Sequence, residues 1–392
     1  MAKKKSALFH KGLIFVLLVL NVVAVLVLLF VYLSQYIPPT FSMLLTYCGL
    51  GFHYLVIVNL IFIVIWLFVK YQYALISIVF LLINVNNIDK TYQMRGTDKP
   101  EVCYNCIKVL SYNAQLFGVY NSNEPAEQIK SRNQILEMLQ KENADIICLQ
   151  EYFYEKSNKI NFSTTDTILS MFNLNKRTNR ATSQFYSCYF PINYKKEYFF
   201  GQAIFSKYRI INKGFVELPD TNTSNSAIYV DIRFKYDTIR VYSLHLESFR
   251  FDKIDYESSH LFLNNELNNP YLNEKAKLLS DRMEVAYKKR AGQAKAVRKH
   301  IEECQYPVII CGDFNDTPTS YSVNEVGSGF TDTYRLSGKG RGTTYHGKHF
   351  PSYRIDYIFH DKKFHSYGHT VNTSISVSDH YPIYSYISIK KR

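Results

Sequence analysis

The sequence predicts an α/β sandwich with two sheets, preceded by transmembrane helices. Residues 1 to about 88 of this 392-residue chain are overwhelmingly apolar. Over the rest of the chain, short strand-like apolar runs alternate with amphipathic stretches, which is typical of an α/β domain. That second part, about residues 104–392, is long enough to bury a two-layer core.

The amino-terminal part contains three apolar runs. The first, Leu13–Leu33, is apolar except for Asn21 and Tyr32, and at 1.5 Å per residue it would span a bilayer core of about 30 Å. The second is Met43–Val69, and the third, Tyr71–Ile83, is shorter. A secretory signal peptide is the alternative for the first run, but the run is too long and no small-residue cleavage site follows it.

The lysines beside these runs predict how the chain crosses the membrane. Lys3–Lys5 and Lys11 precede the first run, and the positive-inside rule places them in the cytoplasm. Three spans would put everything after residue 90 outside the cytoplasm, whereas two spans would return it to the cytoplasm. We expect residues 1–90 to form an anchor of about three helices, followed by a linker over residues 91–103 and an extracytoplasmic domain over residues 104–392.

Charge and cysteine content say little about function. The formal charge is +13, and residues 100–392 hold 38 basic and 31 acidic residues, which suits an anionic partner or an ordinary solvated surface. Cys103 and Cys106 form one C-x-x-C without a second pair, so they do not predict a zinc site. A disulfide between them is an alternative if this region lies outside the cytoplasm. Cys148 and Cys311 lie in apolar runs and are expected to be buried.

Hydrophobic periodicity predicts the elements of the second part. We expect helices at Ala126–Asn143 and Glu274–Glu303, and a surface loop at the Asn-rich Asp252–Asn269. The expected strands are Cys106–Tyr112, Asp145–Leu149, Phe199–Phe205, Ile239–Leu246, Pro307–Cys311, Arg354–Phe359 and Ile383–Ile389.

The strongest local motif is Val308-Ile-Ile-Cys-Gly-Asp-Phe-Asn-Asp316. Gly312 lets the backbone turn closely, and Asp313 and Asn315 lie two residues apart, so an extended chain points both to one face. A carboxylate there can position and deprotonate a water molecule, and the amide can donate to a phosphoryl oxygen. A simple turn would explain Gly-Asp-x-Asn but not the strongly apolar strand before it.

Three other expected strands also end in polar residues, namely Asn113, Glu151 and His245. A carboxylate that follows a buried strand must meet solvent, a cation or a hydrogen-bond donor, and Mg²⁺ takes oxygen ligands of this type. A histidine at a strand end can donate to a phosphoryl oxygen or relay a proton. Each residue alone also has a structural explanation, as a turn asparagine, a solvated glutamate or a hydrogen-bonded histidine.

The last two motifs supply carboxylates and an imidazole. Asp356 lies in Arg354-Ile-Asp-Tyr-Ile-Phe359, and Asp379 and His380 lie in Ser378-Asp-His-Tyr-Pro382. A carboxylate that is hydrogen-bonded to an imidazole fixes its tautomer and raises its basicity. We expect Asp356 and His380 to form such a pair.

Together these motifs, in this order and each at a strand end, resemble the endonuclease/exonuclease/phosphatase superfamily over about residues 104–392. Gly201-Gln-Ala-Ile-Phe-Ser206 also resembles a central structural strand of that family. The resemblance implies a deoxyribonuclease-like four-layer α/β sandwich, in which two packed, mainly antiparallel sheets are flanked by helices.

The resemblance also implies a metal site. Glu151 would ligate Mg²⁺ or Mn²⁺, with Asn113 supporting the metal and the phosphate and Asp379 lying near the metal.

The remaining roles concern the phosphate ester. By the resemblance, Asp313 would orient the attacking water, Asn315 would bind the phosphate, and His245 would contact the phosphate or assist the leaving group. His380, paired with Asp356, would stabilise the pentacovalent phosphorus.

These roles predict a membrane-anchored, divalent-metal-dependent hydrolase of phosphodiester or phosphomonoester bonds, acting by in-line attack of an activated water. A sphingomyelinase-like lipid phosphodiesterase, a phosphatase and a nuclease all fit. The anchor favours a lipid headgroup or an extracytoplasmic nucleotide over genomic DNA. Three spans before this domain are similar to a bacterial branch of the family, which implies a location in the inner membrane. A non-catalytic receptor or scaffold on the same fold is the competing class, although every catalytic residue type is present.

Overall fold

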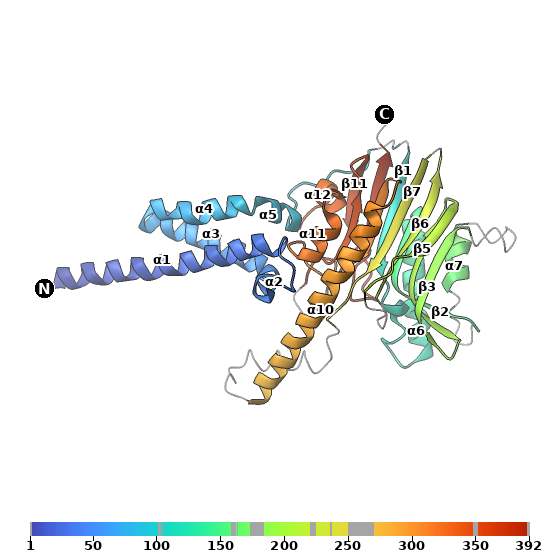
Figure 1. The fold of residues 1–392 in the computed structure, drawn as a ribbon, viewed down its shortest axis with the longest axis horizontal. Coiled ribbons are helices and arrows are strands. Elements are labelled where there is room, and N and C mark those ends of the chain that lie inside the picture. The colour runs from blue at the N-terminus through green and yellow to red at the C-terminus, as the bar shows by residue number, and fades with distance from the viewer. Residues whose placement is uncertain are drawn as a thin grey trace. The chain divides into compact units, whose positions relative to one another are not determined.

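In the computed structural model the chain divides into two compact units (Figure 1). The structure describes residues 2–100, 103, 105–157, 162, 164–172, 184–219, 225–235, 237–249, 270–347 and 352–389. One unit comprises Met1–Thr91 and Thr317–Glu325, and the other comprises Tyr92–Asp316 and Val326–Arg392. A short segment far along the chain therefore belongs by its contacts to the amino-terminal unit.

The amino-terminal unit is helical. Its elements are α1 (Ala2–Ser34), α2 (Met43–Leu50), α3 (Phe52–Val69), η1 (Tyr71–Tyr73), α4 (Ala74–Ile83) and α5 (Val85–Thr91), and α11 (Tyr321–Gly327) begins in it. The second predicted apolar run is thus broken at Gly51. Phe9–Ser34 and Phe52–Val69 are long and apolar enough to cross a membrane, and Tyr71–Ile83 with Val85–Thr91 forms a pair bent by 60°.

A buried polar network joins α1, α3 and α4. Asn21 Nδ2 donates to Ser77 Oγ (2.7 Å), Ser77 Oγ donates to Asn59 Oδ1 (3.0 Å), and Trp66 Nε1 donates to Asn21 Oδ1 (2.8 Å). All four side chains are fully buried. Because these bonds lie among apolar helices, they fix which faces of the three helices meet.

The start of α4 and the end of α5 contact different positions along the chain at α1. Ser77, near the start of α4, bonds to Asn21, whereas Asn84 Nδ2 donates to Leu28 O (3.3 Å). Lys90 Nζ, at the end of α5, donates to Gln35 Oε1 (2.7 Å). The bent pair therefore advances in the same direction as α1.

The second unit contains two six-stranded sheets, in the orders β11-β12-β1-β2-β4-β3 and β5-β6-β7-β8-β10-β9 (Figure 1). Each sheet has one parallel pair, β1–β2 or β7–β8, and its other pairs are antiparallel. The strands are β1 (Cys106–Asn113), β2 (Ile146–Glu155), β3 (Tyr186–Tyr194), β4 (Tyr198–Ser206), β5 (Ile210–Phe215), β6 (Ser226–Phe234), β7 (Asp237–His245), β8 (Val308–Asp313), β9 (Thr331–Asp332), β10 (Asp356–His360), β11 (Phe364–Val371) and β12 (Ile383–Ile389).

Helices cover the outer faces of both sheets. Among the residues that the structure describes, the helices of this unit are α6 (Pro125–Glu142), α7 (Thr164–Met171), α10 (Pro270–Glu302) and α12 (Thr333–Ser337), with the short η2 (Gln115–Gly118). Ile135 and Leu139 of α6 pack in one cluster with Leu110 and Leu149 of the first sheet. On the second sheet, the hydroxyl of Tyr242 lies 2.8 Å from His300 Nδ1 of α10. The predicted α/β sandwich of helix-flanked sheets is confirmed.

An apolar layer fills the space between the sheets. Val109 and Cys148 of the first sheet pack there with Val241 and Cys311 of the second, and all four are fully buried. The predicted burial of the two cysteines is confirmed, and Cys103 and Cys106 are joined by a disulfide. The loop expected at Asp252–Asn269 lies outside the described residues.

A ladder of polar side chains crosses this apolar layer. Gln150 Nε2 donates to Ser243 Oγ (2.9 Å), Ser243 Oγ donates to Gln202 Oε1 (2.9 Å), and Gln202 Nε2 donates to Ser226 O (2.6 Å). Each of these residues is at most 4% exposed. The ladder ties β2 and β4 to β6 and β7, beside the ends of the strands that carry the candidate residues.

Candidate active site

Strand register brings the candidate residues to one end of the sandwich. In the parallel pair β7–β8, His245 lies opposite Asp313. The antiparallel pair β8–β10 places Asp356 on the other side of Asp313. In the first sheet, Asn113 lies opposite Gln150, the residue before Glu151.

Glu151 reaches the site through a bulge. The β2–β4 register shifts between Leu149 and Tyr152, and Glu151 has a φ of 46°, which is unusual for a residue with a side chain. Its side chain is 34% exposed, and Oε1 accepts a hydrogen bond from Asn113 Nδ2 (3.2 Å). Strain of this kind is commonly stored at functional sites.

Asp313 is the centre of the site. Its Oδ2 accepts hydrogen bonds from the side-chain nitrogens Asn113 Nδ2 (3.0 Å) and Asn315 Nδ2 (3.2 Å). Its Oδ1 accepts a hydrogen bond from the backbone N–H of Asn315 (2.8 Å). The Nε2 atoms of His380 and His245 lie 3.7 and 3.8 Å from Oδ2. These separations are longer than a hydrogen bond, so neither imidazole nitrogen is bonded to this carboxylate.

Burial raises the pKa of Asp313 to about 6, with His380 opposing and Asp356 adding to the shift. Desolvation also raises the pKa of Glu151, and the Asp379 carboxylate adds to that effect. At neutral pH Asp313 is still ionised, yet it is more basic than an ordinary aspartate.

His380 and Asp356 form the predicted pair, with His380 Nδ1 2.9 Å from Asp356 Oδ2. Burial opposes a charge on this imidazole, but the carboxylates of Asp356 and Asp313 outweigh it and raise the pKa of His380 well above its ordinary value. Thr344 supports the pair, since its Oγ1 accepts from the amide of Asp356 (3.1 Å). The two carboxylates therefore favour the protonated form of His380, whose Nε2 lies 3.7 Å from Asp313 Oδ2.

The segment that carries His380 is tied to β1. Ser378 Oγ donates to Asn113 O (2.8 Å), and the His380 amide donates to Ser378 Oγ (3.1 Å). The Asp379 amide donates to Gln115 Oε1 (3.3 Å), and its carboxylate lies close enough to Glu151 to affect the pKa there.

Two groups of side chains could hold a divalent cation. Ligand atoms of Asp313, Asp356 and His380 all lie within 4.8 Å of one another. However, Nδ1 of this histidine is bonded to Asp356, and hard cations such as Mg²⁺ prefer oxygen ligands. The partly exposed carboxylate of Glu151, with the Asp379 carboxylate nearby, fits such a cation better, because both offer oxygen ligands.

The two asparagines use their amide protons within the site. Asn315 Nδ2 donates to Leu246 O (2.9 Å) as well as to Asp313, and Asn113 Nδ2 donates to both Glu151 and Asp313. A side-chain amide has only two protons, so in this arrangement both asparagines orient carboxylates. The phosphate contact expected of Asn315 would require one of these bonds to open.

Sequence analysis did not identify Arg290 of α10, which holds the loops behind the site. This fully buried side chain places Nη1 3.0 Å from Asp316 Oδ2, as an ion pair rather than an aligned hydrogen bond. Its Nε donates to Glu247 O (2.9 Å), and Gln293 Oε1 accepts from the Glu247 amide (2.8 Å). Arg290 thus joins the loop after β7 to the loop after β8. A lone arginine in a charged helix carries no sequence signal for this role.

Two family models match the chain. The model of the Endonuclease/Exonuclease/phosphatase family matches residues 110–380, and that of a domain of unknown function (DUF8431) matches residues 13–91. The first match contains every candidate site residue predicted from the sequence. A comparison with curated proteins finds no match.

Several solved structures are similar to the chain. The catalytic domain of human nocturnin with bound sulfate is 17% identical, with a TM-score of 0.48, and the match covers 74% of this chain and 97% of that one. A family protein from Leptotrichia buccalis is 18% identical (TM-score 0.46; 72% and 99% covered). One from Bacteroides thetaiotaomicron is 18% identical (TM-score 0.45; 72% and 94% covered). Likenesses at these values carry no argument about activity, so the family assignment rests on the family model.

Replacing Arg290 by Met should destabilise the protein strongly, because it removes one partner of a buried ion pair with Asp316. We expect a loss of about 3–5 kcal/mol in the free energy of unfolding. The double variant Arg290→Met/Asp316→Leu should recover much of this loss, since it removes both charges. Denaturant unfolding of the full-length protein in detergent, followed by circular dichroism, measures both effects.

The matched control is Arg298→Met on the same helix, where the arginine pairs with the exposed Glu302. Such exposed pairs contribute at most about 1 kcal/mol. If Arg290→Met costs no more than this control, the buried ion pair does not hold the loops.

Proposed function

Because this chain belongs to the endonuclease/exonuclease/phosphatase family, whose members are generally hydrolases of phosphoester bonds, we propose that it is a membrane-anchored, divalent-metal-dependent phosphoesterase. One observation carries the proposal. The buried carboxylate of Asp313 lies between two imidazoles, with Nε2 of His380 at 3.7 Å and of His245 at 3.8 Å. A base and charged or polar donors thus converge on one point.

The side chains fit in-line hydrolysis. Asp313, ionised at neutral pH but unusually basic, would orient a water molecule and accept its proton. His380, held as a cation by Asp356, would donate from Nε2 to a phosphoryl oxygen as negative charge develops there. His245 would contact another phosphoryl oxygen or the leaving group. The water oxygen bonds to phosphorus as the ester oxygen leaves, so no covalent protein intermediate is needed.

Enzymes of this family are typically divalent-metal-dependent. When bound, Mg²⁺ or Mn²⁺ would offset negative charge on the phosphoryl oxygens. We assign Glu151 as the principal ligand, with Asp379 near the ion. Asn113 would hold Glu151 and Asp313 in register, since it bonds to both.

Anchoring by the amino-terminal unit would limit the range of substrates that the enzyme meets. A phosphoesterase tethered to a bilayer meets lipid headgroups at high local concentration. We therefore favour a phosphate-bearing lipid headgroup or an extracytoplasmic nucleotide over genomic DNA. A sphingomyelinase-like phosphodiesterase and a phosphatase both fit the site. A non-catalytic scaffold is disfavoured, because a scaffold has no need to keep a buried, strained and charged constellation.

We further propose that the bent pair α4–α5 is a third crossing of an inner membrane. It runs in the same direction as α1, with Ser77 bonded to Asn21 and Lys90 bonded to Gln35, and with its 60° bend the pair extends about 26 Å. Ser34, where α1 ends, and Thr91, where α5 ends, would then lie on the same side of the membrane. With Lys3–Lys5 in the cytoplasm, the sheet-containing unit would face away from it.

Glu151→Gln should abolish metal-dependent hydrolysis, because it removes the ligand charge while keeping the side-chain shape. We expect turnover of bis(p-nitrophenyl) phosphate to fall roughly 10²-fold or more, across a titration of Mg²⁺ or Mn²⁺. Glu137→Gln, an exposed position on α6, is the control. Near-wild-type turnover of Glu151→Gln at saturating metal would exclude this residue as the principal ligand.

Asp313→Asn and His380→Ala should each lower kcat by roughly 10²–10⁴-fold and change KM little, because both groups act mainly in the transition state. Steady-state kinetics on the same substrate separate the two constants. His365→Ala, in strand β11, serves as the matched control. An effect confined to KM would mean that these residues only bind substrate.

A carboxyl-terminal reporter should be active outside the cytoplasm if the chain crosses the membrane three times. Alkaline phosphatase fused after residue 392 tests this, because it folds only in an oxidising compartment, and a cytoplasmic reporter at the same position is its counterpart. If alkaline phosphatase is inactive and the cytoplasmic reporter is active, the chain crosses the membrane twice and the active site is cytoplasmic.

A further inference from the structure

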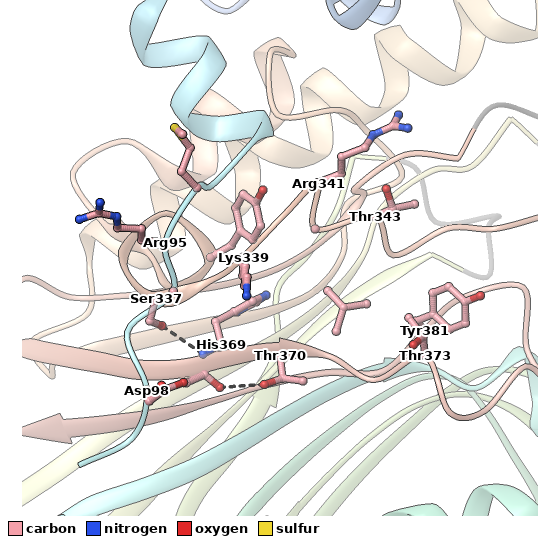
Figure 2. A pocket seen from close by; sticks show the side chains of 16 residues that line it. Arg95, Asp98, Ser337, Lys339, Arg341, Thr343, His369, Thr370, Thr373 and Tyr381 are labelled. Carbon is pink, nitrogen blue, oxygen red and sulfur yellow. Dashed lines mark hydrogen bonds between the residues drawn. The ribbon is translucent and has the colours of Figure 1, made fainter.

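The sheet-containing unit has a cavity of about 830 Å³ that none of the candidate catalytic residues lines (Figure 2). Three segments form most of it. These are the linker from Met94 to Asp98, the loop from Lys339 to Thr343, and the end of β11 with the residues that follow it, from Gly368 to Thr373; Tyr334, Ser337 and Tyr381 complete the lining.

Backbone hydrogen bonds hold the linker as one wall of this cavity. Gln93 and Gly340 exchange two bonds (2.9 and 2.8 Å), and the Gly368 amide donates to Thr97 O (2.7 Å). The linker also passes close to Ser337, because a Cβ at Gly96 would lie 3.1 Å from Ser337 O. The wall is therefore a fixed part of the unit.

The cavity carries an excess of positive charge. Arg95, Lys339 and Arg341 line it, with Asp98 as its single carboxylate. Figure 2 shows Arg95 and Arg341 on opposite sides with Lys339 between them. All three cations are exposed, and within the described part of the chain none of them forms a hydrogen bond or an ion pair.

Neutral hydrogen-bond donors stand beside these cations. Thr343, Thr373 and Tyr381, which carry hydroxyl groups, line the same cavity, whereas the hydroxyl of Thr370 donates to Gly368 O (3.1 Å). Cations together with hydroxyl donors are the groups that bind phosphate oxygens. The lining thus has the chemistry of a phosphate-binding pocket.

This pocket is separate from the active site, although the two are neighbours in sequence. His380 bonds to Asp356, whereas the next side chain, Tyr381, stacks on His346 with ring centres 3.9 Å apart and lines the cavity. Successive side chains of this segment therefore serve different sites.

We propose that the cavity binds the phosphate-bearing headgroup of an anionic membrane lipid. The linker wall begins three residues after Thr91, the last residue of α5, so an extended chain keeps Met94 within about 10 Å of it. Tyr92 and Met94 are 52% and 82% exposed, and such residues beside cations suit a bilayer interface. A nucleic acid would instead need a basic stripe several phosphates long. The pocket would hold the sheet-containing unit to anionic lipid independently of catalysis.

The test is a binding titration of the full-length protein in a neutral detergent. The probe is dihexanoyl phosphatidylglycerol below its critical micelle concentration, followed by calorimetry at low salt. We expect Lys339→Gln/Arg341→Gln to weaken binding at least tenfold. Lys362→Gln/Lys363→Gln, two exposed lysines outside the pocket, should bind as the wild type does. Asp313→Asn should also bind normally, which separates this proposal from the proposed catalysis.

Other probes identify the source of the phosphate. Dihexanoyl phosphatidylcholine should bind at least tenfold more weakly than phosphatidylglycerol, and so should sn-glycerol 3-phosphate and a single-stranded oligonucleotide. Equal binding by the pocket variant, or loss of binding in the Asp313 variant, would overturn the proposal. If sn-glycerol 3-phosphate or the oligonucleotide binds more tightly than phosphatidylglycerol, the proposal is likewise overturned, because the ligand is then soluble and not a lipid. Because the substituted side chains are exposed, circular dichroism should show an unchanged fold.

Discussion

Asn113 links the two sheets at the point where the candidate catalytic residues meet. Its Nδ2 donates to Glu151 of the first sheet (3.2 Å) and to Asp313 of the second (3.0 Å), and its Oδ1 accepts from the Gln115 amide (3.1 Å). Because both protons of this amide are used, a shift of one sheet against the other would break one of its hydrogen bonds. The relative position of Glu151 and Asp313 therefore depends on this one side chain and on the polar ladder beside it.

The site concentrates charge where the fold would otherwise bury apolar groups. Asp313 is fully buried and its pKa is raised to about 6, so its ionised form costs stability at neutral pH. Below that pKa the carboxylate takes up a proton and this cost falls, which is the sign expected for a group selected for reactivity rather than stability. Hydrogen bonds from Asn113 and Asn315, together with the cationic His380, offset part of the cost.

The linker is part of the folded sheet-containing unit rather than a free tether. Its backbone pairs with Gly340 and Gly368, on segments that lie more than 200 residues further along the chain. This pairing builds the wall of the cationic pocket. Residues next to the amino-terminal helices thereby become part of the surface that surrounds Tyr381, the residue after His380.

Local patterns in the sequence identify the candidate catalytic residues and most of the strands that carry them. Glu151, Asp313 and His380 stand out because each is next to a strongly apolar or regular run, which is a local pattern. The strands β3, β5, β6, β9 and β11 were not predicted. All of them except β6 are edge strands, and half-exposed edge strands such as Ile210–Phe215 lack a clear apolar alternation.

The way these residues come together depends on contacts between distant segments of the chain. The Gln150–Ser243 bond joins residues 93 positions apart, and Arg290 meets Asp316 from a different element, so no local pattern marks either contact. The bulge that turns Glu151 towards the site depends on the register of β2 with β4, which the sequence of β2 does not specify alone. Such pairings are set by the free energy of packing two whole sheets together, and this energy is a property of the complete fold rather than of any single segment.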